Sequence, residues 1–449
     1  MEVANKNVLV VGLGKSGVAS ALFLKSRGAH VTVSDTKPRE QFSSELSLLL
    51  DHGIAIETGG HGERTFRGQD LIVVSPGVPF DSALLQQARA MGEPVIGEIE
   101  LAAQFFPGRM IAITGSNGKT TTTALTGEII SAGGFHTLVG GNIGTPAISL
   151  VENATPQTVA VLEVSSFQLE TIQSYRPQIA VILNITPDHL DRHRTFAAYA
   201  SAKARIFENQ KKDDFAVLNA DDPTCVSLAE AVKSKLFWFS RKKEVEQGAL
   251  VRDGHIFFRN GNDEKEIMPI AEISLKGAHN VENVLAAASV GMLMGCNPGQ
   301  IRKTICEFKA VEHRLEYVAT IRGVEFYNDS KATNVDATIK AIESFPANIH
   351  LILGGKDKGS DYSVLNDLLR QRVKAVYTIG AAAAKIESQI KAATGIIQAG
   401  TLDSAVKRAA KTAQPGDIVL LAPACASFDQ FENYEHRGRT FKEIVKGLA

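Results

Sequence analysis

The chain has 449 residues, of which 44% are hydrophobic and 22% charged, a composition typical of an ordinary folded protein. Its formal net charge of −1 gives no reason to expect a nucleic acid or an anionic membrane as a partner. The longest apolar run, VLAAASVGMLMGC, is shorter than the roughly 18 residues of a membrane-spanning helix, and the four scattered cysteines form no C-x-x-C pair. With no secretory signal pattern at the start, we expect a cytoplasmic protein without a membrane or nucleic-acid partner.

Strand-like runs alternate with helical patterns along almost the whole chain, which predicts α/β domains with mainly parallel sheets. At about 150 residues per domain, the length favours three domains. We place them at residues 1–97, 98–310 and 311–449: a Rossmann-like N-terminal domain, a central α/β domain of the phosphate-loop ATPase type and a Rossmann-like C-terminal domain. Short alternating segments between residues 236 and 270 predict an antiparallel flap on the central domain.

A glycine loop, VLVVGLGKSG, follows the first strand-like run. Gly12, Gly14 and Gly17 fit the pattern G-x-G-x-x-G between a strand and a helix, and Asp35 ends the next strand-like run. Glycines at this spacing let the backbone approach a diphosphate, and the helix N-terminus supplies free N–H groups. The pattern does not separate NAD from a nucleotide-diphosphate sugar, so both ligands stay open here.

A second glycine loop lies in IAITGSNGKTTTT, residues 111–123. It is a shortened Walker A loop, because isoleucine stands at position 113 where the usual pattern has glycine. It keeps a lysine, Lys119, for the β- and γ-phosphates and a hydroxyl, Thr120, for Mg²⁺. A purely structural Gly-Lys-Thr is the alternative, but more threonines and a helix follow, which favours ATP binding. The residues expected to bind ATP are Gly115, Ser116, Asn117, Gly118, Lys119, Thr120, Thr121 and Thr122.

Two further polar residues follow strand-like runs beyond this loop. Glu163 ends VAVLE, and His189 comes after the next run, in NITPDHLDRH. Parallel sheets bind ligands at the carboxyl ends of their strands, so both side chains could face one Mg²⁺-triphosphate. Mg²⁺ prefers oxygen ligands, so for His189 a second metal, a capping role and a structural role stay open.

Ten motifs follow one another as they do in the Mur ligases: TGSNGKTTT, GGNIG, LEVSSFQLE, NITPDHLDRH, YASAKARIF, KGAHNVEN, EHRLE, YNDSKATN, LGGKDKG and PACASFDQF. The chain resembles this family of ATP-dependent amino-acid ligases of cell-wall precursor synthesis over essentially its whole length. NDSKATN and PACASFDQF resemble the D-glutamate-adding member most, and the DNPR-type motif of the diaminopimelate- or lysine-adding members is absent. One departure is Arg194, which stands at a position that is commonly glycine in the family.

The resemblance implies a reaction in which UDP-N-acetylmuramoyl-L-alanine, D-glutamate and ATP react through an acyl phosphate. It implies two Mg²⁺ sites, a monomer, and a C-terminal domain that closes over ATP as a lid. It also reverses the reading of Lys203. By pattern alone, this lysine on an amphipathic helix is a solvated surface residue, whereas the resemblance implies a carbamylated side chain beside the second metal.

The resemblance assigns the site residues in five groups, and it gives the first glycine loop to a UDP-sugar rather than to NAD. The UDP-sugar group is Gly14, Lys15, Ser16, Asp35, Thr36, Ser75 and Gly77. The catalytic group is Lys119, Asn142, Glu163, His189 and Lys203, and the metal group is Thr120, Glu163, His189 and Lys203. Residues reaching ATP from beyond the loop are Asn280, Asn283, Arg314 and Asp329. The D-glutamate group is Lys331, Thr333, Lys358, Ser427 and Phe428.

Other functions are weighed against this one. Another Mur ligase or a folylpolyglutamate synthetase-type ligase would share the phosphate loop, but the folylpolyglutamate enzymes would lack the first G-x-G-x-x-G. An NAD-dependent oxidoreductase with a regulatory ATP domain would bind NAD at the first glycine loop and regulatory ATP at the second. An inactive scaffold would be expected to have lost the lysine and carboxylate set, which is present here.

Overall fold

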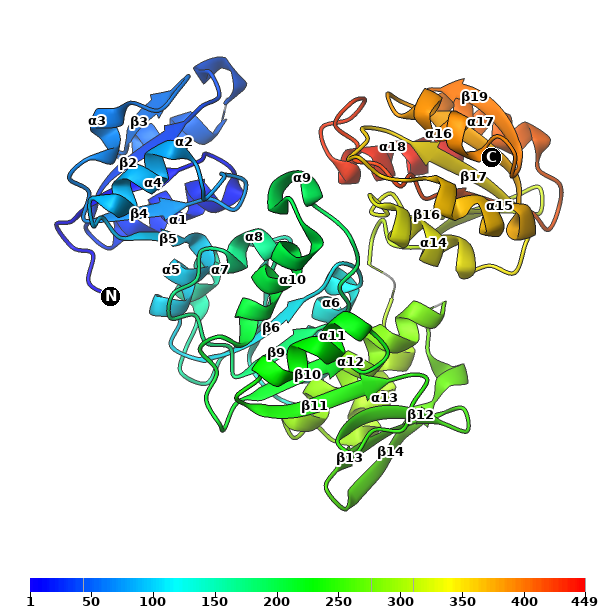
Figure 1. Cartoon of the computed structure of the whole chain (residues 1–449), viewed down its shortest axis with the longest axis horizontal. Helices are drawn as coiled ribbons and strands as arrows, with labels where there is room; N and C mark the ends of the chain where they lie inside the picture. Colours follow the sequence, from blue (N-terminus) through cyan, green and yellow to red (C-terminus); the bar gives the residue numbers. More distant parts are fainter. Residues whose placement is uncertain (43, 276, 310, 449) are drawn as a thin grey trace. The chain divides into compact units, whose positions relative to one another are not determined.

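The computed structural model describes residues 1–42, 44–275, 277–309 and 311–448 (Figure 1). Strands and helices alternate along these residues, and the strands form three sheets in which most pairs are parallel. This confirms the predicted three-domain α/β fold. Within the described parts of the chain, no helix is long and apolar enough to cross a membrane.

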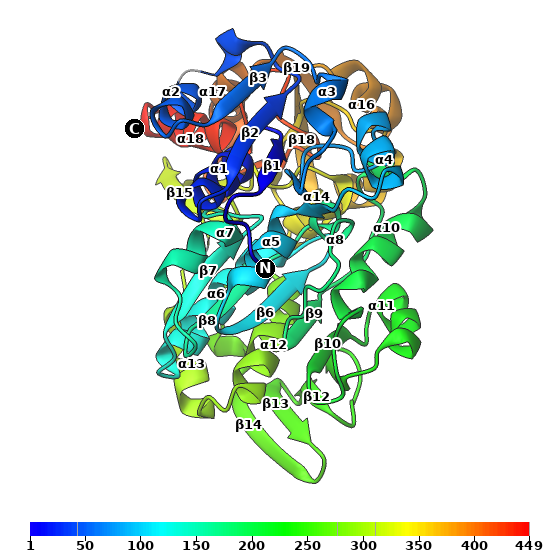
Figure 2. The same cartoon turned by 90° about the vertical axis from the view of Figure 1, so that its left-hand side faces the viewer.

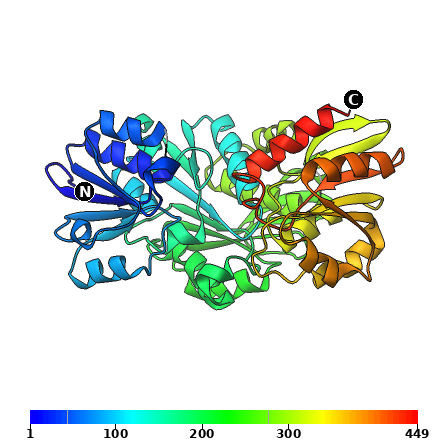
Figure 3. The ribbon, with the colours of Figure 1, turned by 90° about the horizontal axis from the view of Figure 1, so that it is seen from above.

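The N-terminal sheet is fully parallel. Its elements are β1 (Asn7–Val11), α1 (Lys15–Ser26), β2 (His30–Asp35), α2 (Ser44–Asp51), β3 (Ala55–Thr58), α3 (Glu63–Phe66), β4 (Leu71–Val74), α4 (Ala83–Ala90) and β5 (Val95–Gly97). The strand order is β3-β2-β1-β4-β5, with β1 in the middle. Helices lie on both faces (Figure 3), which explains why β1 and β4 are continuous apolar runs rather than alternating ones.

The central domain carries a nine-stranded sheet. Its elements are α5 (Glu98–Phe105), β6 (Arg109–Thr114), α6 (Lys119–Ala132), β7 (Thr137–Gly141), α7 (Ala147–Leu150), β8 (Val159–Glu163), α8 (Ser166–Leu169), β9 (Ile179–Ile182), α9 (Leu190–His193), α10 (Phe196–Ala204), β10 (Phe215–Asn219), α11 (Pro223–Leu228), β11 (Lys235–Ser240), β12 (Gly248–Arg252), β13 (His255–Asn260), β14 (Asp263–Pro269), α12 (Ala278–Leu293) and α13 (Pro298–Glu307). The order is β14-β13-β12-β11-β10-β9-β6-β8-β7, and Figure 2 shows β7, β8, β6 and β9 side by side.

The predicted flap is antiparallel only in part. Strands β12 and β13 pair antiparallel as a hairpin, but β11 pairs parallel with both β10 and β12. The segment therefore extends the central sheet beyond β10 instead of forming a separate antiparallel flap.

The C-terminal sheet has six strands with helices on both faces. Its elements are β15 (Glu316–Ile321), β16 (Val324–Asn328), α14 (Val335–Glu343), β17 (Ile349–Gly354), α15 (Asn366–Arg372), β18 (Val373–Ile379), α16 (Ala383–Ile390), β19 (Gly395–Gly400), α17 (Leu402–Thr412), β20 (Ile418–Leu421) and α18 (Tyr434–Lys446). The order is β15-β16-β20-β17-β18-β19, parallel except for β15. One core packs α14, α15 and α16 against the sheet, and a second packs α17 and α18.

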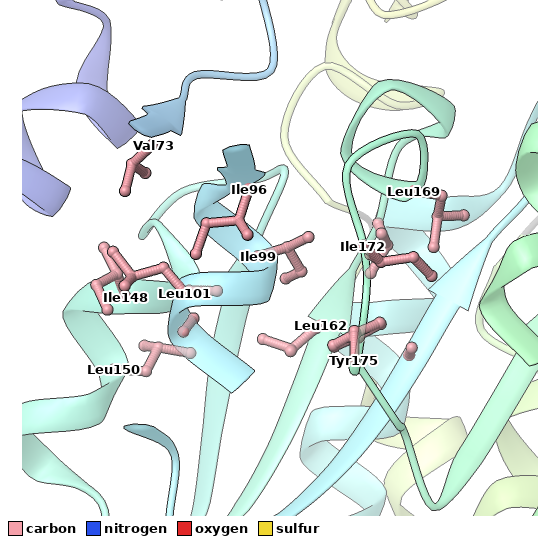
Figure 4. Packing of buried hydrophobic residues seen from close by; sticks show 14 of the residues in the cluster. Val73, Ile96, Ile99, Leu101, Ile148, Leu150, Leu162, Leu169, Ile172 and Tyr175 are labelled. Atoms are coloured by element: carbon pink, nitrogen blue, oxygen red, sulfur yellow. The ribbon is translucent and has the colours of Figure 1, made fainter. Parts of the chain in front are cut away.

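A single hydrophobic cluster runs from the N-terminal sheet into the central one. Figure 4 shows Val73 and Ile96 near Ile99 and Leu101 of α5, with Ile148 of α7 beside them. Helix α5 starts directly after β5, so the chain passes from one sheet to the other inside this cluster. The domain boundaries at residues 97 and 310 stay predictions, and residue 310 lies outside the described residues.

By the contacts between their residues, the described parts of the chain form two compact units. The first unit comprises Met1–Ile185, Arg192–Met268 and Leu285–Thr304, and the second comprises Thr186–Asp191, Pro269–Val284 and Ile305–Ala449.

Candidate active site

The shortened phosphate loop connects β6 to α6 in the first unit, as the sequence predicts. Gly118 has a left-handed backbone (φ +84°) and precedes the first residue of α6, and Gly115 also has a positive φ of +153°. A side chain at Gly115 would meet Cβ of Leu183 at 3.0 Å, so both the angle and the space require glycine there. The loop and the N-terminus of α6 present backbone N–H groups, the arrangement that binds phosphate.

Asn184 supports this loop, and the sequence analysis missed it. Its carbonyl accepts from the backbone N–H of Ser116 at 2.9 Å. Its side chain accepts from the N–H of Asn117 at 2.9 Å and donates to the Asn117 carbonyl at 3.1 Å. The signal was present, because Asn184 follows β9 shortly after its last residue and parallel strands place such residues at the ligand edge.

The ammonium of Lys119 lies within the loop. Its Nζ donates to the carbonyl oxygens of Gly115 and Ser116, both at 2.9 Å. These contacts hold the cation at the loop that the sequence assigns to phosphate, where a point charge with several donors can stabilise phosphate oxygens.

Glu163, at the end of β8, joins two predicted site residues. Its Oε2 accepts from the Thr120 hydroxyl at 2.7 Å, and its Oε1 accepts from the Asn142 side chain at 2.9 Å. The carboxylate is only 2% exposed, and neither of these two partners carries a charge. A buried carboxylate is stable when a cation accompanies it, and carboxylate and hydroxyl oxygens are ligands that Mg²⁺ prefers. Thr120 and Glu163 therefore fit a Mg²⁺ site.

Lys203 is buried, so the surface reading that its pattern alone favours is wrong. The side chain is 1% exposed, and its Nζ donates to the Gly115 carbonyl at 2.8 Å and to the Thr114 hydroxyl at 3.3 Å. The ammonium also lies 4.7 Å from the centre of the Tyr199 ring, and the Tyr199 hydroxyl is 3.0 Å from Oγ of Ser116. Helix α10 thus directs Lys203 at the phosphate loop.

The first glycine loop, between β1 and α1, is held by Ser75 and Asp35. Ser75 Oγ donates to the Gly12 carbonyl at 2.9 Å, and Gly12 has a φ of +95°. Asp35 accepts from the backbone N–H of Leu13 at 2.7 Å and of Lys37 at 2.8 Å. Around Gly14, by contrast, an added Cβ would meet no atom within 4 Å, which leaves space for a ligand. Asp35 therefore shapes the turn, and its contact with a ligand stays a prediction.

Left-handed backbone angles occur at one residue of the NITPDHLDRH segment and at the residue directly after it. His189 has a φ of +54° and Arg194 a φ of +66°, which explains why glycine is favoured at the position of Arg194. His189 belongs to the second unit, where Asp188 accepts from the His189 N–H at 2.9 Å and from the Asn334 side chain at 3.0 Å. A metal shared by His189 and Glu163 stays a prediction.

The second unit also contains the four residues predicted to reach ATP from beyond the loop. The Asn283 amide donates to Oδ1 of Asn280 at 2.9 Å, and both side chains are buried. Arg314 lies 4.0 Å from Asp329, measured between NH1 and Oδ1. Burial raises the pKa of the Asp329 carboxyl to about 6, although the Arg314 charge opposes this shift.

The residues predicted to bind D-glutamate follow three strands of the C-terminal sheet. Lys331 and Thr333 follow β16, Lys358 follows β17, and Ser427 and Phe428 follow β20. Ser427 is buried, Phe428 is 67% exposed, and Lys331 Nζ lies 5.2 Å from the centre of the Tyr434 ring.

Arg437, on α18, links two of these three segments and was not predicted. Its guanidinium donates to Oγ of Ser330 at 2.9 Å and to the carbonyl of Cys425 at 3.2 Å, and its side chain is 1% exposed. Its helical context resembles a surface helix, so no local pattern marks it.

Comparison with known proteins shows which family the chain belongs to. Three family models match: the Mur ligase MurD-like N-terminal domain over residues 6–97, the Mur ligase middle domain over 113–291, and the Mur ligase glutamate ligase domain over 313–425. A protein of Koribacter versatilis named UDP-N-acetylmuramoylalanine–D-glutamate ligase is 66% identical over 449 residues, covering 100% of this chain and 99% of that protein. The chain belongs to the Mur ligase family.

Further relatives of this Mur ligase agree. A protein of the same name from Acidobacterium capsulatum is 59% identical, over 99% of this chain and 97% of that protein. Among solved structures, a pseudomurein peptide ligase type C from Methanothermus fervidus matches with a TM-score of 0.64 at 20% identity, over 99% of this chain and 100% of that one. A MurF ligase from Thermotoga maritima matches with a TM-score of 0.62 at 17% identity, over 100% and 97%. These two structures share the fold.

Within this Mur ligase, the sequence-predicted residues form two sets. In the first unit, Lys119, Thr120, Asn142, Glu163 and Lys203 lie around the phosphate loop. In the second unit, three strand ends of one sheet present the residues predicted to bind D-glutamate.

Proposed function

We propose that this Mur ligase joins D-glutamate to the L-alanine carboxyl group of UDP-N-acetylmuramoyl-L-alanine, with conversion of ATP to ADP and phosphate, in peptidoglycan precursor synthesis. The observation that carries the proposal is the 66% identity over the whole chain to a ligase of that name. The phosphate loop with Lys119, Thr120 and the buried Glu163 supports the ATP-dependent part of the reaction.

The chemistry requires activation of a carboxylate, which is a poor electrophile because its charge is spread over two oxygens. In the first step, a carboxylate oxygen of the L-alanine residue attacks the γ-phosphorus of ATP, the bond to the β-phosphate oxygen breaks, and ADP leaves with its electron pair. The product is an acyl phosphate. Lys119 at the phosphate loop stabilises the negative charge on the transferred group.

In the second step, the neutral amine of D-glutamate attacks the carbonyl carbon of the acyl phosphate. The tetrahedral intermediate collapses as the bond from carbon to the phosphate oxygen breaks, and the nitrogen loses its extra proton to the departing phosphate to give the amide. Asn142, whose amide donates to Glu163, is proposed to lie beside the attacked carboxyl group together with His189.

Mg²⁺ would be held by Thr120 and Glu163 at a first site, and His189 and Lys203 are proposed at a second. When bound, the metal neutralises charge on the phosphate oxygens. The UDP-sugar is proposed to bind at the first glycine loop, with its diphosphate at Gly14, Lys15 and Ser16. Asp35 and Thr36 would lie near the uracil, and Ser75 and Gly77 would close the pocket.

The second unit would complete the site. Asn280 and Asn283 are proposed to face adenine, Arg314 and Asp329 to reach ATP, and closure of the C-terminal domain over ATP stays a prediction. The amino acid would bind Lys331, Thr333, Lys358, Ser427 and Phe428. The enzyme is proposed to act in the cytoplasm, which supplies ATP, and to be a monomer, as the resemblance to the family implies.

Lys203 is proposed to carry a carbamate. Carbon dioxide adds to a neutral amine, and the product is an anion whose oxygens suit Mg²⁺. Burial of Lys203 against the phosphate loop supports a role inside the site. Lys203→Ala should remain folded but lose nearly all turnover, with partial rescue by short carboxylic acids, and Lys203→Glu should recover only a small part. Full turnover of Lys203→Ala without added acid would exclude the carbamate.

The experiment that tests the function is an ADP-release assay with UDP-N-acetylmuramoyl-L-alanine and one amino acid at a time. D-Glutamate should support turnover, whereas L-glutamate and D-aspartate should be rejected by at least about 100-fold. A site built to hydrogen-bond two carboxylates leaves donors unpaired with the wrong spacing or configuration. Comparable turnover with L-lysine or meso-diaminopimelate would assign the chain to a different activity in the family.

A further inference from the structure

Two loops that carry proposed D-glutamate residues are joined backbone to backbone. Lys356 and Ala426 exchange hydrogen bonds, with N···O distances of 2.8 and 3.1 Å. Lys358 lies two residues beyond Lys356, and Ser427 follows Ala426. Gly355 makes the close approach possible, since a Cβ there would meet the Ala426 carbonyl oxygen at 2.3 Å. The bridge fixes the backbone near both residues but leaves the turn that contains Lys358 to be held by other contacts.

Tyr362 supplies the contacts that hold the turn containing Lys358. Its side chain is fully buried, its hydroxyl donates to Oδ1 of Asp357 at 2.7 Å, and the same hydroxyl lies 3.0 Å from Sγ of Cys425. One phenol therefore touches the residue before Lys358 and the residue two before Ser427. Its backbone N–H donates to Gln389 at 2.8 Å, which fixes the base of the ring to α16.

Asp357 is saturated by neighbours within the same domain. Besides Tyr362, its Oδ1 accepts from the Ser360 N–H at 3.1 Å, which closes the turn around Lys358. Its Oδ2 accepts from Lys385 Nζ on α16 at 2.7 Å. Burial alone would raise the pKa of Asp357, but the hydrogen bonds from Lys385 and Tyr362 outweigh it and lower the pKa. The group is thus a carboxylate at neutral pH, paired with Lys385.

We infer that Tyr362 and Asp357 are positioning residues for the amino-acid substrate: they hold the Lys358 turn against the Cys425–Ser427 segment at the spacing that D-glutamate requires. This inference rests on the proposed function. As positioning residues, Tyr362 and Asp357 do not touch the substrate. They act through Lys358 and Ser427.

Lys385 has a second, electrostatic part in this arrangement. An unpaired carboxylate next to Lys358 would attract its ammonium and repel the two carboxylates of D-glutamate. By pairing with Asp357, Lys385 keeps that carboxylate from competing with the substrate for Lys358. Lys358 also forms an ion pair with Asp188 of the same unit, with 3.8 Å between Nζ and Oδ1.

The test compares two variants that each remove one buried hydroxyl. Tyr362→Phe removes the contact to Asp357, and the matched control Tyr377→Phe removes an equally buried hydroxyl that lies 3.0 Å from Nδ1 of His350. We expect Tyr362→Phe to raise the KM for D-glutamate about tenfold with kcat within about twofold, because a hydrogen bond to a charged group is lost. The KM values for ATP and UDP-N-acetylmuramoyl-L-alanine should not change, and Tyr377→Phe should leave all three KM values unchanged. Unfolding curves check that both variants fold.

A second variant tests the electrostatic part without altering the hydroxyl. Lys385→Met should raise the KM for D-glutamate about fivefold at low salt, and the increase should shrink as added salt screens the exposed carboxylate. An unchanged KM for D-glutamate in folded Tyr362→Phe, or equal rises in all three KM values, would overturn the inference. Because the wild type is measured in the same assay, absence of D-glutamate turnover there would instead overturn the proposed function.

Discussion

At the residue scale, Lys119 is expected to act in only one of the two proposed nucleotide sites, the one that binds ATP. Its ammonium is held by the carbonyls of Gly115 and Ser116, within the second glycine loop. Lys119→Ala should therefore lower ADP release by at least about 100-fold, because a transition-state charge loses its partner. Calorimetry should find the affinity for UDP-N-acetylmuramoyl-L-alanine within about threefold of wild type. An equal loss of that affinity would contradict the assignment of two separate loops.

Glu98, the first residue of α5, gives a pH-dependent stability. Burial raises the pKa of its carboxyl from 4.5 to about 7, although its Oε1 accepts from the Ile148 N–H at 2.8 Å. A raised pKa in the folded state means that the folded protein holds the proton more tightly than the unfolded chain. Its contribution is therefore fully present below pH 4.5 and is lost as the pH rises towards and through 7.

Glu98→Gln removes this dependence while keeping the shape of the side chain. Urea denaturation should find the variant more stable than wild type at pH 8, by up to about 3 kcal/mol, and no more stable at pH 4. The comparison between the two proteins cancels other titrating groups, such as Asp329. A stability difference that does not vary with pH would mean that the Glu98 carboxyl has the same pKa in the folded protein as in the unfolded chain.

Residues with a local motif were predictable and residues without one were not. Lys119, Thr120 and Glu163 lie together because a motif and a strand end each identify them. Asn184 was missed although its place just after β9 marks the ligand edge of the sheet, whereas Arg437 has no such signal, since its role arises from hydrogen bonds to groups distant in the sequence. The resemblance to the family, rather than the helical periodicity, predicted that Lys203 lies in the site and not on the surface. The proposed ligand contacts stay predictions.

At the scale of elements, the β1–α1 turn depends on its glycines for different reasons. A Cβ on Gly17 would lie 1.8 Å from the Gly12 carbonyl oxygen, whereas a Cβ on Gly14 would meet nothing within 4 Å. Gly17→Ala should thus destabilise the protein by about 3 kcal/mol in urea denaturation. Gly14→Ala should leave stability unchanged but weaken binding of UDP-N-acetylmuramoyl-L-alanine in calorimetry, because the methyl group enters the proposed diphosphate space. Unchanged binding by Gly14→Ala would place the diphosphate elsewhere.

The alternation of elements was predictable because buried parallel strands are continuous apolar runs. Strands β6, β8 and β9 are each such a run and lie side by side inside the central sheet. The pairing direction of strands was harder to predict, since the sequence of a short alternating strand does not show whether its neighbour runs parallel or antiparallel to it. That is why β11 and β12 are parallel within a segment predicted to be antiparallel.

At the scale of the whole molecule, ligand binding should separate the competing functions. UDP-N-acetylmuramoyl-L-alanine at about 100 times its Kd should stabilise the folded protein by about 2.7 kcal/mol and raise the melting temperature accordingly. NAD at the same concentration should produce no shift, because the first glycine loop is assigned to a UDP-sugar. Thermal denaturation with each ligand measures both. Stabilisation by NAD alone would favour an oxidoreductase.

The hydrophobic cluster that passes through α5 limits how Mur ligases exchange parts by recombination. Ile96 and Val73 from the N-terminal sheet share one cluster with Ile99, Leu101 and Ile148 (Figure 4). A chimaeric enzyme joined at residue 97 would bring together two halves of a core that were never packed against each other, and mismatched volumes in a core are destabilising. A viable chimaera has to carry α5 and α7 along with the N-terminal sheet. The part of this end of the chain that can be exchanged as one piece is therefore larger than its five-stranded sheet.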